Sequence, residues 1–348
     1  MKPSPSPAPS PAPSPAPPSS SSSPSLTARE LATQPGSWRR AAEAAASAPG
    51  LPRPDERVAV TGCGTSWFMA QAYAALREAS GQGETDAFPA SEFPVSRTYD
   101  RLVVITRSGT TTEVLDLIDE VRERWEVLAL TADPTTPVMR AADDVAVLDW
   151  ADEESVVQTR FATTALAFLR AGLERYGRLP AGVRTVAEAA GDAERALAEP
   201  LPAAALAAEQ WTFLGSGWAY GLAQEAALKM REAAGAWTEA YPAMEYRHGP
   251  IAVSAPGRVT WAFGPLPDGL ADDVAKAGGT LVGGTLIGGA PVGGAPVGGA
   301  PVGGGAEGAE DPMASLVRAQ RLAVAVAEAR GLNPDAPRNL TRSVILAP

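Results

Sequence analysis

The sequence predicts an α/β protein made of two tandem, doubly wound parallel sheets. Short apolar runs alternate with segments whose apolar residues recur at helical spacing. This alternation is typical of parallel strands that are covered by helices on both faces. The same succession of strand, glycine turn and helix starts again at Trp211, so we expect the second half of the chain to repeat the plan of the first.

The first unit is expected over residues 27–182, and a stretch rich in alanine and glutamate, 183–210, is expected to form a connecting helix. In the first unit each apolar run of strand length is followed by a turn and then by a helical pattern. The predicted strands are 57–61, 101–105, 126–131 and 144–148, and the predicted helices are 67–79, 111–124 and 159–176.

The second unit is expected over residues 211–348. It opens with an apolar run, a Gly-Ser-Gly turn and a helical pattern, which is the order seen at the start of the first unit. Its predicted strands are 211–214, 258–263 and 280–282, and its predicted helices are 219–234 and 313–330.

Two segments are of low complexity. Residues 1–26 form a tail of proline and serine with too few apolar side chains to fold, so we expect it to be disordered. Residues 278–305 consist mainly of glycine-containing pentapeptides that end as GGAPV repeats. We interpret them as an expanded surface loop, because loops tolerate added length at little cost. The first repeat, 280–282, also fits a strand.

The composition excludes several classes of protein. A net charge of −11 and an isoelectric point near 4.8 argue against nucleic-acid binding, which needs a basic face. A single cysteine and a single histidine allow no internal disulfide and no nitrogen/sulfur zinc site. No stretch has the length of a membrane span or the pattern of a signal peptide. We therefore expect a cytoplasmic protein that needs neither metal nor cofactor and has no nucleic-acid or membrane partner.

Two strand-to-helix turns of the first unit carry the strongest functional signal. The segment VITRSGTTTEV, 104–114, reads as a buried strand, a turn rich in hydroxyl groups and a helix start. The earlier segment GCGTS, 62–66, has the same character. Backbone N–H groups and hydroxyls at the start of a helix form a ready site for an anion, so we predict a phosphate site. The second unit has Phe263-Gly264-Pro265-Leu266 at the matching place, without hydroxyl groups.

The helix expected at 219–234 carries Glu225, Lys229 and Glu232 on one face. Such a row is often no more than a solvated ladder of ion pairs, but this helix follows a glycine turn at the carboxyl end of a strand, where α/β sheets bind ligands. His248 follows in a Gly-Pro loop. A lone histidine is often structural, yet imidazole transfers protons readily near neutral pH.

Taken together, the segments GCGTS, TRSGTTTE, EAALKMREAAGAWTEAYPAMEYRHGP and PRNLTRSV closely resemble the double sugar-isomerase (SIS) domain family. The resemblance is to the isomerase half of glucosamine-6-phosphate synthase and to its free-standing relatives, which include SIS-type amino-sugar-phosphate deaminases. It spans about residues 27 to 348 apart from the repeat segment. It implies two doubly wound sheets of flavodoxin-like type.

The resemblance implies a role for each matching residue. Glu232 matches the carboxylate that moves a proton between C1 and C2, and Lys229 the lysine one turn before it. His248 matches a ring-opening histidine that reaches the active site of the neighbouring subunit, which implies a homodimer with a shared active site. Residues expected to bind a sugar 6-phosphate are Gly64, Thr65, Ser66, Thr106, Ser108 and Thr111, with Arg107 in place of a glutamine and with Gln158 in the substrate-lining loop.

The sequence departs from the synthase pattern in two ways. No glutaminase region precedes the SIS pair, so we do not expect glutamine-dependent amination by this chain. Arg342 stands where the synthase has a lysine, and a guanidinium is a very poor nucleophile. It can anchor substrate oxygens but is not expected to form an imine with a ketose.

Three functions stay open on the sequence. The first choice is an enzyme that isomerises and deaminates glucosamine 6-phosphate, or a close amino-sugar 6-phosphate, by proton transfer between C1 and C2. The second is a dehydratase that eliminates water from N-acetylglucosamine 6-phosphate through the same carbanion. The third is a phosphosugar sensor without catalytic activity.

Overall fold

The computed structural model describes residues 23–177, 179–286 and 310–346. The first half of the chain forms a parallel sheet with the strand order β2-β1-β3-β4-β5. This order is the flavodoxin-like doubly wound arrangement. The strands are β1 (Val58–Gly62), β2 (Thr85–Pro89), β3 (Arg101–Ile105), β4 (Glu126–Thr131) and β5 (Asp144–Val147).

The second half forms another parallel sheet, with the order β7-β6-β8-β9. The strands are β6 (Gln210–Gly215), β7 (Trp237–Pro242), β8 (Arg258–Leu266) and β9 (Thr280–Leu286). In both sheets the first strand of the unit lies between the next two strands along the chain, so the plan of the first half is repeated. The predicted fold class is thereby confirmed.

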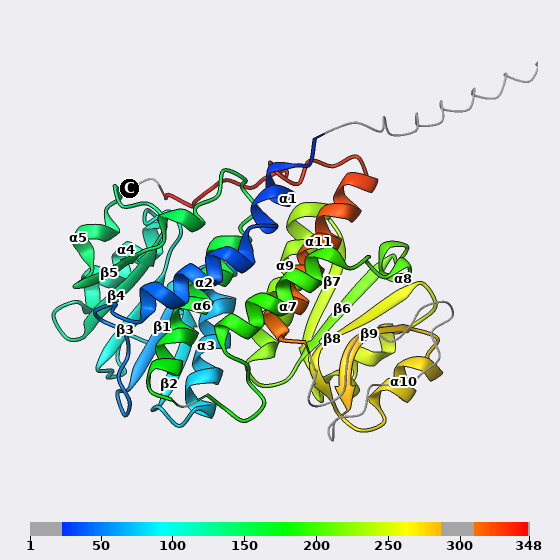
Figure 1. Cartoon of the computed structure of the whole chain (residues 1–348), viewed down its shortest axis with the longest axis horizontal. Coiled ribbons are helices and arrows are strands. Elements are labelled where there is room, and N and C mark those ends of the chain that lie inside the picture. The colour runs from blue at the N-terminus through cyan, green and yellow to red at the C-terminus, as the bar shows by residue number, and fades with distance from the viewer. Residues whose placement is uncertain (1–22, 178, 287–309, 347–348) are drawn as a thin grey trace, which may run out of the picture.

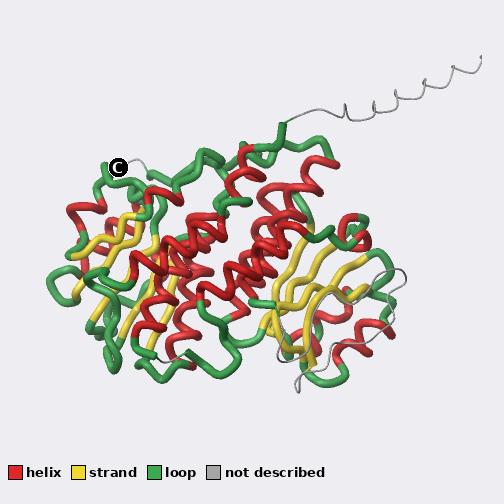
Figure 2. Tube along the Cα trace, in the orientation of Figure 1, coloured by secondary structure: helices red, strands yellow, loops and turns green. Residues whose placement is uncertain are grey.

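The helices form three groups around the two sheets (Figure 1). A central group lies between the sheets and packs on both, since α3 contacts β1 and β2, α9 contacts β6 and β7, and α3 and α9 contact each other. Shorter helices cover the outer faces: α4 and α5 on the first sheet, α10 on the second (Figure 2). The central helices are α2 (Gln34–Ala45), α3 (Thr65–Ala79), α6 (Arg160–Arg175), α7 (Val186–Ala198), α9 (Ala219–Ala234) and α11 (Pro312–Ala329). The others are α1 (Leu26–Leu31), α4 (Thr112–Val121), α5 (Val138–Ala141), α8 (Ala203–Leu206) and α10 (Leu270–Lys276).

One continuous hydrophobic core joins the two halves. It contains Trp38, Phe161 and Trp211, which are buried between the central helices and the inner faces of the two sheets. Smaller clusters lie under the outer helices of each sheet. Because the two halves share their main core, the relative position of the two sheets is set by packing of large apolar side chains.

Two strands were not predicted from the sequence. Both are edge strands: β2 pairs only with β1, and β7 pairs only with β6. Their sequences, TDAFP and WTEAYP, mix apolar residues with acidic residues and proline, and most of their side chains are half-buried. Proline is tolerated at an edge because one side of the strand makes no ladder hydrogen bonds.

The low-complexity segments are only partly described. At the end of the tail predicted to be disordered, Ser25 is the N-cap of α1 and Leu26 is its first residue, so the described fold begins before residue 27. In the segment 278–305, the first repeat forms a strand, as predicted, and β9 continues to Leu286. The GGAPV repeats lie outside the described residues, as does most of the tail.

Candidate active site

The two glycine turns predicted to bind phosphate lie side by side. They follow β1 and β3, which are neighbours in the sheet and run in register, with Val58 opposite Arg101 and Thr61 opposite Val104. The turns 62–66 and 106–111 therefore meet at the carboxyl edge of the sheet, between β1 and β3. From this point the strand order runs to β2 on one side and to β4 and β5 on the other. This is the place where doubly wound sheets bind their ligands.

The 106–111 turn is tightly packed. Gly109 has a φ of +61°, and a Cβ added there would lie 2.1 Å from the Thr136 hydroxyl, so both the backbone conformation and the space require glycine. Thr106 and Ser108 are buried. The Thr106 hydroxyl has no hydrogen-bond partner among the described residues. A buried hydroxyl without a partner is costly, and an anion bound in the turn would satisfy it.

The predicted row on α9 is buried and not a solvated ladder. Lys229 is 1% exposed and Glu225 is 0% exposed, while Glu232 retains 19% exposure. The Lys229 ammonium lies 3.5 Å from Glu225 Oε1 and forms a shorter hydrogen bond with Glu232 Oε2. The lysine thus bridges a fully buried carboxylate and one that solvent can reach.

Burial shifts the protonation of this row. Desolvation raises the pKa of Glu225 from 4.5 to about 8, against the opposing effects of the Lys229 ammonium and the Thr65 hydroxyl. Burial acts to lower the pKa of Lys229, but the neighbouring carboxylates of Glu225 and Glu232 outweigh it and the pKa is raised. Lys229 is therefore a persistent cation at neutral pH.

A close helix crossing brings the row next to the turns. A Cβ added at Gly221 of α9 would lie 2.4 Å from the carbonyl oxygen of Phe68 and 2.8 Å from the backbone nitrogen of Ala72, both on α3. Glycine is needed at 221 for this approach of two backbones. Helix α3 starts at Thr65, so the last residues of the 62–66 turn are the first residues of this helix. The Thr65 hydroxyl acts to lower the pKa of Glu225, which reflects the same proximity.

The loop 152–159 closes another side of the site. Glu153 is buried and accepts hydrogen bonds from the backbone N–H groups of Thr159 and Arg160, so it caps the start of α6. It also contributes to the electrostatic environment of Lys229. Gln158 has a buried Oε1 without a hydrogen-bond partner among the described residues, and its contact with substrate stays a prediction.

Arg107 points to this loop. Its guanidinium donates to the carbonyl oxygens of Ser155 at 3.2 Å and Val156 at 3.3 Å, and it lies 3.7 Å from Glu153 Oε2. The side chain is 3% exposed. Its direct contact with phosphate stays a prediction, while the observed bonds fasten the turn to the loop.

Arg342 is held by acidic and carbonyl groups of the same loop. Its guanidinium donates to Asp152 Oδ1 at 2.5 Å and to the carbonyl oxygen of Glu153. Residues 341–346, which we call the C-terminal strap, then run across the 106–111 turn and the start of α4, where the Thr112 N–H donates to the carbonyl of Val344. The strap is the last part of the red segment that runs from α11 towards the C-terminus in Figure 1.

His248 is not brought to the row on α9 by any described contact within the chain. It follows the short 3₁₀ turn Glu245–Arg247 and is exposed. The remaining predicted residues, Gly64, Ser66 and Thr111, lie in the two turns. The structure therefore gathers the turns, the row and Gln158 in one region and leaves His248 on the surface.

Sequence reasoning missed Glu30 and Glu153, which hold the loop 152–159. Glu153 lies well before α6, whose N-cap position is Thr159, so it does not fit the local pattern of a capping residue. Glu30 bonds to Ser155, 125 residues further along the chain, and no local signal marks such a pair.

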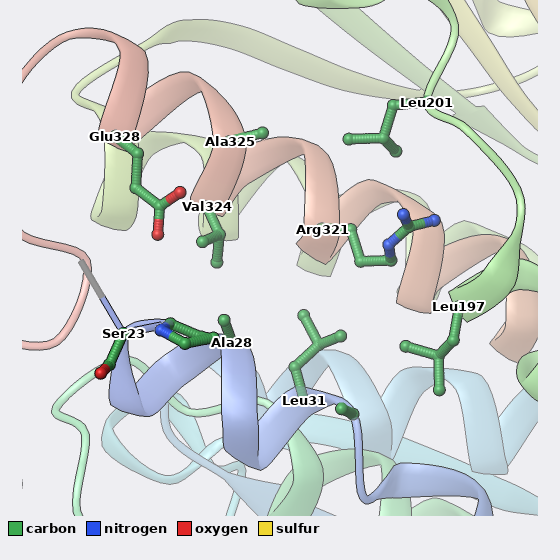
Figure 3. Close-up of a pocket in the computed structure, with 11 residues that line it drawn as sticks. Ser23, Ala28, Leu31, Leu197, Leu201, Arg321, Val324, Ala325 and Glu328 are labelled. Carbon is green, nitrogen blue, oxygen red and sulfur yellow. The ribbon is translucent and has the colours of Figure 1, made fainter. Parts of the chain in front are cut away.

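A groove of about 520 Å³ lies elsewhere, between α1, α7 and α11 (Figure 3). Its lining is mainly aliphatic and includes Ala28, Leu31, Leu197 and Val324. None of the predicted site residues lines it. Among the described residues, no helix combines the length and apolar character needed to cross a bilayer, and no group of His, Cys, Asp and Glu side chains is placed to hold a metal ion.

The chain is similar in sequence to glutamine–fructose-6-phosphate aminotransferases (isomerizing). The protein from Synechocystis sp. is 26% identical over 334 residues, which cover 85% of this chain and 52% of the relative. That from Zymomonas mobilis is 29% identical over 327 residues, which cover 84% and 54%. The chain thus spans about half the length of the curated relatives it matches. No protein-family model matches it.

Solved structures confirm the fold. Glucosamine-6-phosphate deaminase from Thermotoga maritima superposes with a TM-score of 0.72 at 22% identity, covering 92% of this chain and 100% of that one. Tagatose-6-phosphate ketose/aldose isomerase from Escherichia coli superposes with a TM-score of 0.71 at 18% identity, covering 93% and 97%. The resemblance to the double SIS family, drawn from the sequence motifs, is confirmed by these likenesses and by the aminotransferase relatives.

Proposed function

We propose that this chain, which has the fold of two tandem SIS domains, is an enzyme that isomerises and deaminates glucosamine 6-phosphate or a close amino-sugar 6-phosphate. The observation that carries the proposal is the buried row Glu225, Lys229 and Glu232 set against the turn 62–66 through the crossing at Gly221. A phosphate cradle beside a buried carboxylate and ammonium is suited to proton abstraction from a sugar phosphate.

In the proposed reaction Glu232 removes the proton from C2 of the ring-opened sugar. Glu232 is the member of the row that solvent, and hence a substrate, can reach. The Lys229 ammonium stabilises the negative charge that develops on the C1 oxygen, because a buried cation acts strongly in a region of low dielectric. Glu232 returns the proton at C1, the C1 oxygen takes up a proton as the C2 amine loses one, and an imine is left at C2. Water then hydrolyses the imine, so that one water is consumed and fructose 6-phosphate and ammonia are formed.

A second copy of the chain completes the site in this proposal. His248 is exposed and stands on a surface loop that follows the edge strand β7. An exposed imidazole that contacts no member of the row in its own chain is suited to act across an interface between copies. We therefore propose a homodimer in which His248 opens the sugar ring in the partner's site.

The position of Arg342 supports deamination over synthesis. Its guanidinium is bound to Asp152 and to the carbonyl of Glu153, and it carries no nucleophilic nitrogen. Imine formation between this side chain and a ketose therefore has no place in the proposed reaction. The likeness to the Thermotoga maritima deaminase supports the same choice.

A proton NMR time course in D₂O with glucosamine 6-phosphate, and separately with its N-acetyl form, tests the proposal. Fructose 6-phosphate and ammonia from the free amine are the expected products. An unsaturated sugar from the N-acetyl form indicates a dehydratase instead. Unchanged spectra of both compounds, together with measurable binding, indicate a sensor and overturn the proposed activity.

A further inference from the structure

Glu30 is a buried carboxylate on the short helix α1, outside both sheets. It is 6% exposed. Its Oε1 accepts a hydrogen bond from the Glu154 backbone N–H at 2.6 Å, and its Oε2 accepts one from the Ser155 hydroxyl. The Ser155 N–H lies 3.4 Å from both oxygens. Hydrogen bonds to a buried, charged acceptor are strong, so Glu30 holds this part of the loop 152–159 firmly.

The same loop residue is bonded to the 106–111 turn. The carbonyl oxygen of Ser155 accepts a hydrogen bond from Arg107, whose backbone lies between Thr106 and Ser108. Ser155 is thus held through its N–H and hydroxyl by Glu30 and through its carbonyl by Arg107. A continuous set of hydrogen bonds leads from α1 through the loop to the predicted phosphate turn.

Helix α1 is itself fixed, so it can serve as an anchor. The carboxylate of Asp335 accepts hydrogen bonds from the backbone N–H groups of Leu26 and Thr27 at 2.9 and 2.8 Å. The carbonyl oxygen of Asp335 accepts one from Val156, the residue after Ser155. The loop is therefore held at adjacent residues by two groups, the side chain of Glu30 and the backbone of Asp335.

The two faces of α1 have different surroundings. Ala28 and Leu31 line the groove between α1, α7 and α11, as Figure 3 shows. Glu30 and Thr27 instead make the polar contacts to the loop and to Asp335. The polar contacts of the helix are thus directed at the segment that also carries Glu153 and Gln158.

We propose that Glu30 is a positioning residue for the sugar-phosphate site. It acts through Ser155, keeping the loop 152–159 and Arg107 of the 106–111 turn in the geometry that receives the substrate. This inference rests on the proposed function. It predicts an effect on substrate binding and little effect on the proton-transfer step, since Glu30 bonds to the loop and to no member of the row on α9.

The test uses Glu30→Gln in the full chain. Glutamine has the size of glutamate but offers one acceptor oxygen, and its NH₂ group faces a donor of the loop. The KM for C2 proton exchange of glucosamine 6-phosphate is expected to rise about tenfold, in line with the loss of a hydrogen bond to a charged group, with kcat within about twofold of the parent. Glu43→Gln, an exposed position on α2, is the matched control and should leave both constants unchanged.

Two further measurements separate positioning from a general loss of structure. Adding Ser155→Ala to Glu30→Gln removes the donor that faces the new amide, so the double variant should bind no worse than the single one. Amide hydrogen exchange over residues 153–160 should accelerate in Glu30→Gln and not in Glu43→Gln. This measurement needs no ligand. It therefore tests whether Glu30 holds the loop 152–159 even if the parent does not bind the sugar phosphate and the proposed function is wrong. Unchanged exchange, or accelerated exchange with an unchanged KM in an active parent, overturns the proposal.

Discussion

The two halves of the molecule share one topology but present different chemistry at the carboxyl edges of their sheets. In the first half, the turn after β3 carries Thr106, Ser108 and Thr111. In the second half, β8 continues as Gly264 and Pro265, and a groove of about 400 Å³ remains at the matching edge. The turn after β3 offers hydroxyl donors to an anion, while the matching end of β8 carries no hydroxyl group.

The helices that follow the first strand of each half also differ, but here the second half carries the charged side chains. Counted from the first residue of each helix, Gln71 and Ala75 of α3 stand where α9 has Glu225 and Lys229. The first half therefore supplies the turns and the second half supplies the charged row. In the proposed site the two copies of the fold would therefore contribute different parts, which the crossing of α3 and α9 brings together.

The largest effect is expected from removing the proposed base. Glu232→Gln should keep the fold and sugar-phosphate binding but slow exchange of the C2 proton with D₂O by at least about 10²–10⁴-fold, because an amide does not accept the proton. Glu78 holds the same position on α3 and is exposed, so Glu78→Gln is the matched control. If NMR showed equal exchange rates in the Glu232→Gln variant and the parent, the proposed catalytic role of Glu232 would be contradicted.

The next effect compares the two sheet edges. Ser108→Ala and Thr111→Val should each weaken sugar-phosphate binding by roughly 1.5–3 kcal/mol, the usual worth of a hydrogen bond to a charged group. Ser216→Ala, at the first turn of the second half, should leave the affinity unchanged. Isothermal titration measures all three. Equal losses at both edges would contradict the assignment of phosphate to the first half.

A smaller effect concerns two glycines, Gly109 in the 106–111 turn and Gly264 near the end of β8. Gly109 and Gly264 both have positive φ, at +61° and +82°, and a side chain there costs about 1–2 kcal/mol in backbone strain. At Gly109 a Cβ would also collide with Thr136, whereas at Gly264 nothing lies within 4 Å. Gly109→Ala should therefore lower the thermal midpoint more than Gly264→Ala. If Gly264→Ala lowered the thermal midpoint more than Gly109→Ala, the described difference in packing around the two glycines would be contradicted.

A further effect is a change in the pH dependence of stability. The pKa of Glu225 rises from 4.5 to about 8 on folding, so between these values the folded protein binds more protons than the unfolded chain. Stability from this residue is therefore lost as pH rises through that range. Glu225→Gln removes the contribution, and its melting temperature should fall less than that of the parent between pH 5 and pH 8. If the melting temperatures of the two proteins changed equally with pH, the raised pKa of Glu225 would be contradicted.

The parts of the site with local signals were predictable from the sequence. The 106–111 turn was predicted because hydroxyl groups directly follow an apolar run, and the row on α9 because helical spacing places Glu225, Lys229 and Glu232 on one face. These signals lie within a few residues of one another. Most central strands and long helices were predicted for the same reason, with bounds within a few residues of those observed.

The remainder depends on contacts between distant parts of the chain. Arg107 reads as a phosphate ligand in the sequence, yet in the structure its guanidinium bonds to the loop 152–159, and that orientation follows from the packing of Glu153 and Ser155. The role of Glu30 depends on a partner more than a hundred residues away. The burial of Lys229 and Glu225 follows from the packing of two halves against each other. The domain boundaries and the role of His248 stay predictions.

In the proposed site, the close approach at Gly221 would select substrates by their length. Two backbones touch there, so side-chain rotation at the crossing does not change the spacing between α3 and α9. If the 62–66 turn binds the phosphate and Glu232 is the base, this spacing favours a phosphate ester whose reacting carbon lies at the matching number of bonds from the phosphorus. Shorter esters would be held with their acidic carbon out of reach of Glu232, however well their phosphate is bound.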